Sequence, residues 1–201
     1  GAVIYTGFRK KTTKEEYLDY LAGKRLEELI NVTAVKAGDV FFIPAGMVHA
    51  IGGGVLLAEI QQTSDVTYRI YDWDRVDASG RPREMHTALA LDAINFNLDS
   101  NNLIRTEPEI NKTVFLAESP WFHTSLIMFN RPVIKDYSLT ESFVIYICTG
   151  SMAVIEWMGH REEIREGETL LIPASAESVA IIPRETATLL EVYVPGRVKM
   201  Q

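Results

Sequence analysis

The stretch VKAGDVFFIPAGMVHAIGGG, residues 35–54, decides the fold. An apolar segment follows a Gly-Asp pair and ends at Pro44, and a single histidine, His49, precedes three glycines. Short apolar runs bounded by Gly and Pro are typical of buried strands joined by turns. The stretch therefore predicts two short strands and a turn, and His49 is either a metal ligand or an ordinary imidazole.

A second copy of this stretch lies near the C-terminus. VKAGDVFFIPAG at 35–46 aligns with IREGETLLIPAS at 164–175, at a constant offset of 129 residues. A looser match pairs GAVIYTGF at Gly1 with GSMAVIEW at Gly150, at an offset of 149 residues. The offsets differ by 20 residues, close to the length of a helical stretch at 12–31. We therefore predict a duplicated strand unit whose first copy carries a helical insertion.

The alignment also bears on a metal site and on completeness. Ser178 aligns with His49, so a metal site that uses this imidazole belongs to the first copy alone. The second copy has two apolar segments before Gly150, FHTSLIMF and SFVIYICTG. Their first-copy equivalents are expected before Gly1, which predicts a first barrel that is only partly contained in this chain.

Most of the remaining chain has the pattern of short strands, rich in β-branched and aromatic residues and bounded by Gly, Pro, Asp or Ser. The predicted strands are AVIYTGF, DVFFIPA, GVLLAEIQQ, TYRIYDW, FHTSLIMF, SFVIYICTG, SMAVIEWM, ETLLIPA, VAIIP and TLLEVYV. Two stretches are predicted to be helical instead, TTKEEYLDYLAGKRLEELI and REMHTALALDAINF. In the first, Thr12 and Thr13 are candidate N-caps, and Gly23 is expected to divide the stretch into two pieces.

Composition excludes several classes of protein. The net charge of −7 argues against a nucleic-acid-binding surface. A single cysteine, Cys148, excludes an internal disulfide and a thiolate metal cage, and it favours a reducing, cytoplasmic location. The uncharged segment Val40–Ala58 contains Pro44 and four glycines, so we expect strands and a turn there and no membrane span.

Three motifs follow one another in PAGMVHAIGGGVLLAEIQQTSDVTYRIYDWDR, residues 44–75: P-x-G-x-x-H, S-D-x-x-x-R and Y-D-W-x-R. With GRPREMHTALALDAINF after them, they closely resemble the type I mannose-6-phosphate isomerases of the cupin superfamily, particularly the shorter bacterial form. The resemblance covers essentially the whole chain and implies that the N-terminal part of the family's fold is missing from it. It also implies a mainly β protein made of cupin jelly-roll barrels, one partial and one complete, with a helical insertion.

On this resemblance we expect three segments. Residues 1–98 form the C-terminal part of the first, catalytic cupin, including the insertion at 12–31. Residues 99–112 form a linker, and residues 113–201 form a second, metal-free cupin. The implied partner is a small hexose phosphate, with no nucleic acid and no membrane, and a homo-oligomer is possible.

The resemblance also implies the site. These enzymes use zinc, and of the family's ligands only the histidine of P-x-G-x-x-H is present, as His49; the others are expected before Gly1. Since zinc needs three or four protein ligands, we expect this chain alone to hold zinc weakly and to turn over poorly. The resemblance places Asp65 and Arg69 in the catalytic pocket, with Ser64 and Thr67 as candidate substrate-binding residues.

Each of these residues has a second interpretation. The guanidinium of Arg69 suits phosphate or enediolate oxygens, but it could equally pair with a nearby acid on the surface. Asp65 is either a proton carrier or a turn residue that caps its own backbone. Ser64 and Thr67 either orient the substrate or are ordinary residues at a strand edge.

The predicted function is the zinc-dependent interconversion of mannose 6-phosphate and fructose 6-phosphate through an enediol(ate), within carbohydrate metabolism. Two alternatives stay open. One is a non-catalytic cupin that binds a sugar or serves as a scaffold, and the other is a cupin isomerase for a different hexose 6-phosphate, such as glucose 6-phosphate.

Overall fold

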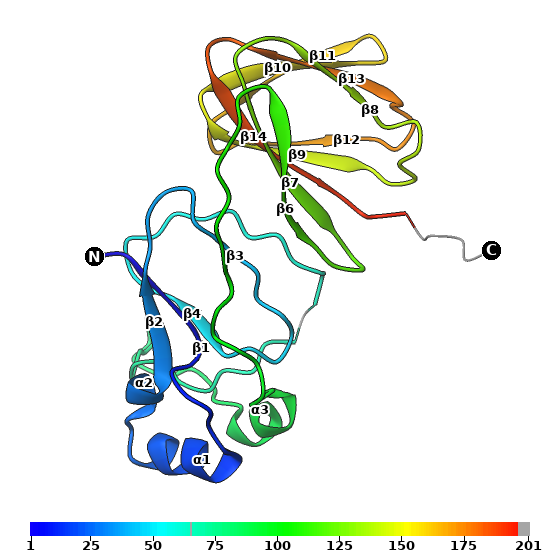
Figure 1. The fold of residues 1–201 in the computed structure, drawn as a ribbon. Helices are drawn as coiled ribbons and strands as arrows, with labels where there is room; N and C mark the ends of the chain where they lie inside the picture. The colour runs from blue at the N-terminus through cyan, green and yellow to red at the C-terminus, as the bar shows by residue number, and fades with distance from the viewer. Residues whose placement is uncertain (65, 197–201) are drawn as a thin grey trace, which may run out of the picture. The chain divides into compact units, whose positions relative to one another are not determined.

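The computed structural model describes residues 1–64 and 66–196, which form two compact units. Unit 1 comprises Gly1–Leu57 and Thr63–Ile104, and unit 2 comprises Ala58–Gln62 and the chain from Arg105 onward. Figure 1 shows the elements of each unit by their labels. Strands predominate in the described chain, so the prediction of a mainly β protein is confirmed.

Unit 1 combines two small sheets with helices. Its elements are β1 (Val3–Phe8), α1 (Lys14–Ala22), α2 (Leu26–Leu29), β2 (Ile30–Ala34), β3 (Val40–Phe41), β4 (His49–Ile51), α3 (Thr87–Ala93) and β5 (Leu103–Ile104). An antiparallel three-stranded sheet has the order β2-β1-β4, and β3 pairs with β5.

Unit 2 has two antiparallel sheets around one core. Its strands are β6 (Lys112–Glu118), β7 (His123–Phe129), β8 (Val133–Asp136), β9 (Val144–Gly150), β10 (Met152–Trp157), β11 (His160–Arg165), β12 (Thr169–Ile172), β13 (Ser178–Pro183) and β14 (Ala187–Tyr193). The sheet orders are β11-β10-β13-β8 and β12-β9-β14-β7-β6. Alternate residues face inward, as in β14, where Ala187, Leu189 and Glu191 are buried while Thr188 and Leu190 are not.

The internal repeat of the sequence is visible in the strand pairing. In unit 1, β1 lies between β2 and β4, and in unit 2, β10 lies between β11 and β13 in the same order. Val3–Phe8 and Met152–Trp157 are related by the 149-residue offset seen in the sequence. β10 and β11 are joined by a two-residue turn, whereas α1 and α2 occupy the corresponding place between β1 and β2. The helices are therefore an insertion into the repeated unit, as predicted.

The inserted helices begin and end largely where the sequence indicates. Thr13 caps α1 by accepting a hydrogen bond from the backbone N–H of Glu16 at 3.2 Å. α1 ends at Gly23, as expected, but the predicted insertion boundary is wrong at its end, because Ile30 already belongs to β2. The second predicted helical stretch is helical only over Thr87–Ala93. No helix in the described part of the chain is long and apolar enough to cross a membrane.

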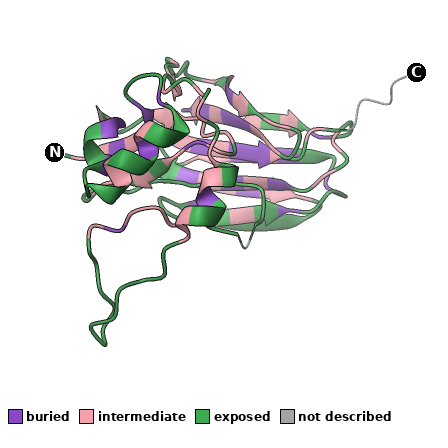
Figure 2. Cartoon of the chain, turned by 90° about the horizontal axis from the view of Figure 1, so that it is seen from below, coloured by how far each residue is buried: buried purple, intermediate pink, exposed green. Residues whose placement is uncertain are grey.

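Two strand predictions are wrong. GVLLAEIQQ and TYRIYDW form no strand among the residues that the structure describes, and Leu56 is 99% exposed. Figure 2 shows largely exposed residues along the segment between β4 and α3, in agreement with this result. The β-propensity of these residues is genuine, but a strand also needs a partner to accept and donate its ladder hydrogen bonds.

Aromatic side chains form much of the core of unit 1. The rings of Phe8 and Phe96 stack with centroids 5.5 Å apart, and Tyr17 of α1 meets both rings edge-on. Tyr17 is fully buried, and its hydroxyl has no hydrogen-bond partner among the described residues. Burial accordingly raises the pKa of the Tyr17 hydroxyl to about 12.

Replacing Tyr17 by phenylalanine is expected to leave stability unchanged or to raise it by about 1 kcal/mol, because a buried hydroxyl without a partner carries a desolvation cost. Urea unfolding of the wild type and of Tyr17→Phe measures this directly. A loss of more than about 1 kcal/mol would show that the hydroxyl has a partner after all.

Candidate functional site

The P-x-G-x-x-H motif forms a tight turn that leads into β4. Gly46 has a φ of +84°, and a Cβ at this position would lie 2.9 Å from the carbonyl oxygen of Ala93. The Gly46 carbonyl accepts a hydrogen bond from the Asn95 N–H at 2.9 Å. Only glycine tolerates both the left-handed backbone and the close approach, so the motif needs Gly46 for the turn that positions His49.

His49 is held with one ring nitrogen available. Its Nδ1 lies 3.0 Å from the carbonyl oxygen of Met47. Since a carbonyl can only accept, Nδ1 carries the proton and the neutral ring keeps its lone pair on Nε2. A metal-binding histidine commonly donates its second ring N–H to a carbonyl in this way. The side chain is exposed, so His49 is suited to coordinate a metal through Nε2.

A buried threonine and a half-buried asparagine lie next to the turn. Thr6, which lies opposite His49 in the ladder, is fully buried and donates to Asn102 Oδ1 at 3.1 Å. Asn102 Nδ2 in turn lies 3.5 Å from Met47 Sδ. Sequence reasoning missed both polar residues, because this contact joins positions 96 residues apart and neither belongs to a recognisable motif.

A small cavity adjoins the histidine. It measures about 50 Å³ and is lined by Tyr5, Leu26, Glu27, Ile30, Val48, His49, Ala50, Ile70, Tyr71 and Trp73. Pockets that hold small ligands usually measure about 300–1,000 Å³. This cavity could take a water molecule or an ion, but it is too small for a hexose phosphate.

Two hydrogen bonds join Arg69 to His86. The Arg69 N–H donates to His86 Nδ1 at 3.1 Å, and the His86 N–H donates to the Arg69 carbonyl at 2.8 Å. The Arg69 guanidinium donates through Nη1 to the Glu84 carbonyl at 3.0 Å. This contact is to a neutral carbonyl, and among the described residues no carboxylate forms an ion pair with Arg69, so its guanidinium could still receive an anion.

Ser64 and Thr67, also predicted as site residues, lie in a segment that forms no helix or strand among the described residues. Ser64 and Thr67 are exposed, and the Ser64 hydroxyl accepts from the Val66 N–H at 3.2 Å. Asp65 lies outside the described residues. Among residues 1–64 and 66–196, no hydrogen bond joins His49 to Ser64, Thr67 or Arg69.

The residues of the Y-D-W-x-R motif make contacts that hold unit 1 together. Asp72 is buried and accepts from Arg83 through both carboxylate oxygens, one of them from Nε at 2.7 Å. The Trp73 ring packs on Tyr5 of β1 with centroids 5.6 Å apart, and the Arg75 guanidinium lies over the Trp73 ring, 5.3 Å from its centroid. The motif thus anchors the chain after Arg69 to the sheet that carries His49.

The Asp72–Arg83 pair predicts a pH effect. The Arg83 hydrogen bonds hold the pKa of Asp72 below its usual value, so the pair stabilises the fold above about pH 4 and loses this effect as pH falls further. We expect Asp72→Asn to lower the melting temperature at pH 6 and to match the wild type more closely at pH 3. Asp74→Asn, at an 87% exposed side chain, is the control and should show little difference at either pH.

The described residues supply one fitting metal donor. Among them, no group of three or more His, Cys, Asp or Glu side chains converges on a point. The tautomer of His49 suits zinc, but a zinc site needs two or three further donors. The residues present therefore do not make a zinc site by themselves.

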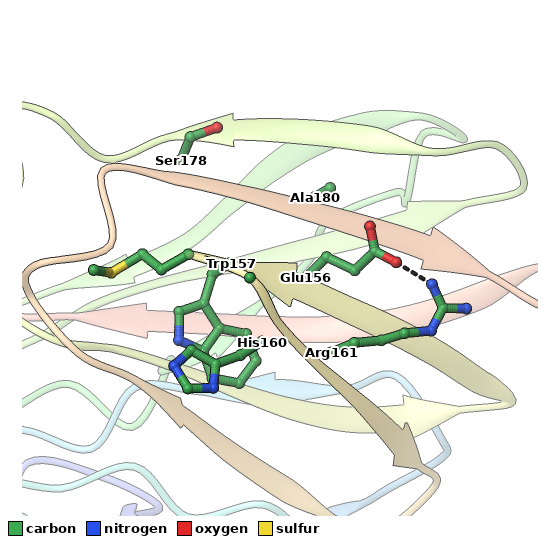
Figure 3. Close-up of a pocket in the computed structure, with 8 residues that line it drawn as sticks. Glu156, Trp157, His160, Arg161, Ser178 and Ala180 are labelled. Carbon is green, nitrogen blue, oxygen red and sulfur yellow. Dashed lines mark hydrogen bonds and ion pairs between the residues drawn. The ribbon is translucent and has the colours of Figure 1, made fainter.

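Unit 2 contains a more open hollow of about 570 Å³ beside the β10–β11 turn. Figure 3 shows its lining: the rings of Trp157 and His160 stack with centroids 5.3 Å apart, and Glu156 pairs with Arg161. Ser178, the counterpart of His49 in the repeat, lies at its edge. Glu156 and Arg161 pair with each other, so each of these two charges already has a partner.

Comparisons with known proteins agree with the resemblance in the sequence. The mannose-6-phosphate isomerase of Streptococcus mutans is 31% identical over 182 residues, which are 89% of this chain and 56% of that protein. The mannose-6-phosphate isomerase ManA of Bacillus subtilis is 48% identical over 83 residues, or 41% of this chain and 26% of that protein. No protein-family profile matches the chain.

The fold has a solved counterpart. The crystal structure of the mannose 6-phosphate isomerase from Bacillus subtilis superposes with a TM-score of 0.74 over 96% of this chain and 60% of that one, at 24% identity. This likeness shows that the two chains share a fold. The chain is thus similar in sequence to mannose-6-phosphate isomerases and similar in fold to one of them, as its motifs predicted. The chain spans little more than half the length of the Streptococcus mutans relative.

Proposed function

We propose that this chain belongs to an enzyme that interconverts mannose 6-phosphate and fructose 6-phosphate. The observation that carries the proposal is the 31% identity to a mannose-6-phosphate isomerase across 89% of the chain. The turn that presents His49 with a bare Nε2 supports it, because it preserves the ligand expected of a zinc isomerase.

The reaction is an internal transfer of a proton. In the open-chain aldose, a base removes the proton from C2 and the resulting enediolate is protonated at C1, while the hydroxyl proton moves from O2 to O1. No oxidant or reductant is consumed. The step requires a base at the carbon and positive charge near the developing oxyanion.

We propose roles for this chain's residues accordingly. Arg69 binds phosphate or enediolate oxygens, since its guanidinium is bonded to a neutral carbonyl. Asp65 carries the proton, and Ser64 and Thr67 orient the sugar. His49 is one ligand of zinc, which when bound would act as a Lewis acid, and the other ligands come from outside the described residues. A cytoplasmic location also stays a prediction.

The test is a coupled assay of mannose 6-phosphate turnover on the complete product of the gene, with and without a chelator. We expect turnover that the chelator abolishes and added zinc restores. Activity that survives metal removal would overturn the zinc role. Turnover of glucose 6-phosphate alone would favour the other isomerase, and binding of a hexose without turnover of any hexose 6-phosphate would favour a sugar-binding cupin.

A further inference from the structure

An ion pair between a half-buried lysine and a buried glutamate joins the two sheets of unit 2. Lys135 lies on β8 of one sheet and Glu191 on β14 of the other. Lys135 lies opposite Val179, which is fully buried, so its side chain also points between the sheets. Its Nζ is 2.9 Å from Glu191 Oε1, and the two side chains are 17% and 3% exposed.

Hydroxyl groups contact both members of the pair, one at the ammonium group and others beside the carboxylate. Lys135 Nζ donates to Thr113 Oγ1 of β6 at 3.0 Å. The Tyr137 hydroxyl donates to Glu191 Oε1 and is also hydrogen-bonded to the Tyr146 hydroxyl. Burial is the largest cause that raises the pKa of both tyrosines far above the ordinary value, and the nearby charge of Glu191 adds to it, so the phenols stay neutral.

The groups around Glu191 extend along β7. Ser125 lies opposite Glu191 in the ladder, and its Oγ is 2.9 Å from His123 Nε2. His123 Nδ1 is 2.7 Å from the Glu118 carboxylate. His123 therefore contacts the Glu118 carboxylate, whereas Lys135 contacts Glu191 directly.

We propose that unit 2 contains a site for a small monovalent cation beside the buried Glu191 carboxylate, and that the half-buried ammonium group of Lys135 is its permanent, tethered occupant. One buried carboxylate with hydroxyl oxygens beside it balances a single positive charge. Because the ammonium group is covalently attached to the chain, it cannot be lost to solvent. The Glu191 carboxylate therefore keeps its counter-charge without a bound ion. The inference is independent of the isomerase proposal, because it concerns only residues of unit 2.

Chemical rescue tests the site. Lys135→Ala removes the occupant and is expected to lower the melting temperature of unit 2 by at least about 10 °C, because it leaves a buried carboxylate unpaired. Propylammonium chloride should raise the melting temperature of this variant in a saturable manner, beyond the effect of equimolar tetramethylammonium chloride. Lys112→Ala, at a 67% exposed lysine on β6, is the matched control and should neither lose stability nor respond.

A second pair of variants decides the matter if Lys135→Ala does not fold. Lys135→Met keeps most of the volume and should be strongly destabilised, whereas Lys135→Met/Glu191→Gln should recover much of the loss, because the buried charge is then gone. The proposal is overturned if propylammonium has no selective effect on a folded Lys135→Ala. It is also overturned if Lys135→Met melts with the wild type, or if the double variant recovers nothing.

Discussion

Replacing His49 by alanine is expected to lower both the affinity for zinc and the turnover of mannose 6-phosphate by at least about 100-fold in the complete gene product. The lower bound follows from second-shell partners of metal ligands, whose loss already costs about 10–100-fold, since a ligand itself should matter more. The Nδ1 contact to the Met47 carbonyl leaves Nε2 as the donor that alanine removes. Zinc affinity is measured by competition with a chromophoric chelator, and turnover by the coupled assay.

His160→Ala is the matched control. His160 is an exposed histidine of unit 2 that stacks on Trp157, and it does not align with His49 in the repeat. We expect its zinc affinity and turnover to match the wild type. If His49→Ala keeps wild-type zinc affinity, His49 is a surface imidazole, and the zinc role of this turn must be abandoned even if the isomerase activity stands.

The sequence predicted the elements that depend on local interactions. Thr13 is the N-cap of α1 and Gly23 is its C-cap. Both could be predicted because helix caps depend on contacts between residues close in sequence. GVLLAEIQQ looks like a strand for equally good local reasons, but strand formation depends on a distant partner, and none pairs with it in the described residues. Conversely, HREEIR looks too polar for a strand and forms β11, because only Ile164 has to face the core.

In the candidate site, too, the sequence predicts what depends on local interactions and not what depends on distant contacts. The turn at Gly46 and the position of His49 could be predicted, since the motif itself encodes them. The link from Thr6 to Asn102 could not, because it depends on how distant loops pack. The burial of Glu191 could have been predicted. In TLLEVYV it lies two residues after buried Leu189, and period-two alternation places both side chains on the face toward the core.

Replacing Phe8 by alanine is expected to destabilise unit 1 by about 3–5 kcal/mol, the usual cost of removing a buried aromatic ring. Phe8 is 7% exposed and contacts both Phe96 and Tyr17, so its loss leaves a cavity that neither neighbour can fill without moving. Urea unfolding followed by hydrogen exchange of β1 and β4 measures the effect. Phe115→Ala, at a 55% exposed ring in unit 2, is the control and should cost less than about 1 kcal/mol.

Phe8→Ala and His49→Ala together separate structure from ligation. Phe8 ends β1, and the N–H of the preceding Gly7 donates to the Val48 carbonyl at 2.8 Å, directly before His49. Loss of Phe8 should therefore weaken zinc binding only together with the protection of β4 against hydrogen exchange. His49→Ala should weaken zinc binding while that protection stays unchanged, because its exposed ring contributes little packing. If Phe8→Ala unfolds β4 and leaves zinc binding intact, the metal does not bind at this turn.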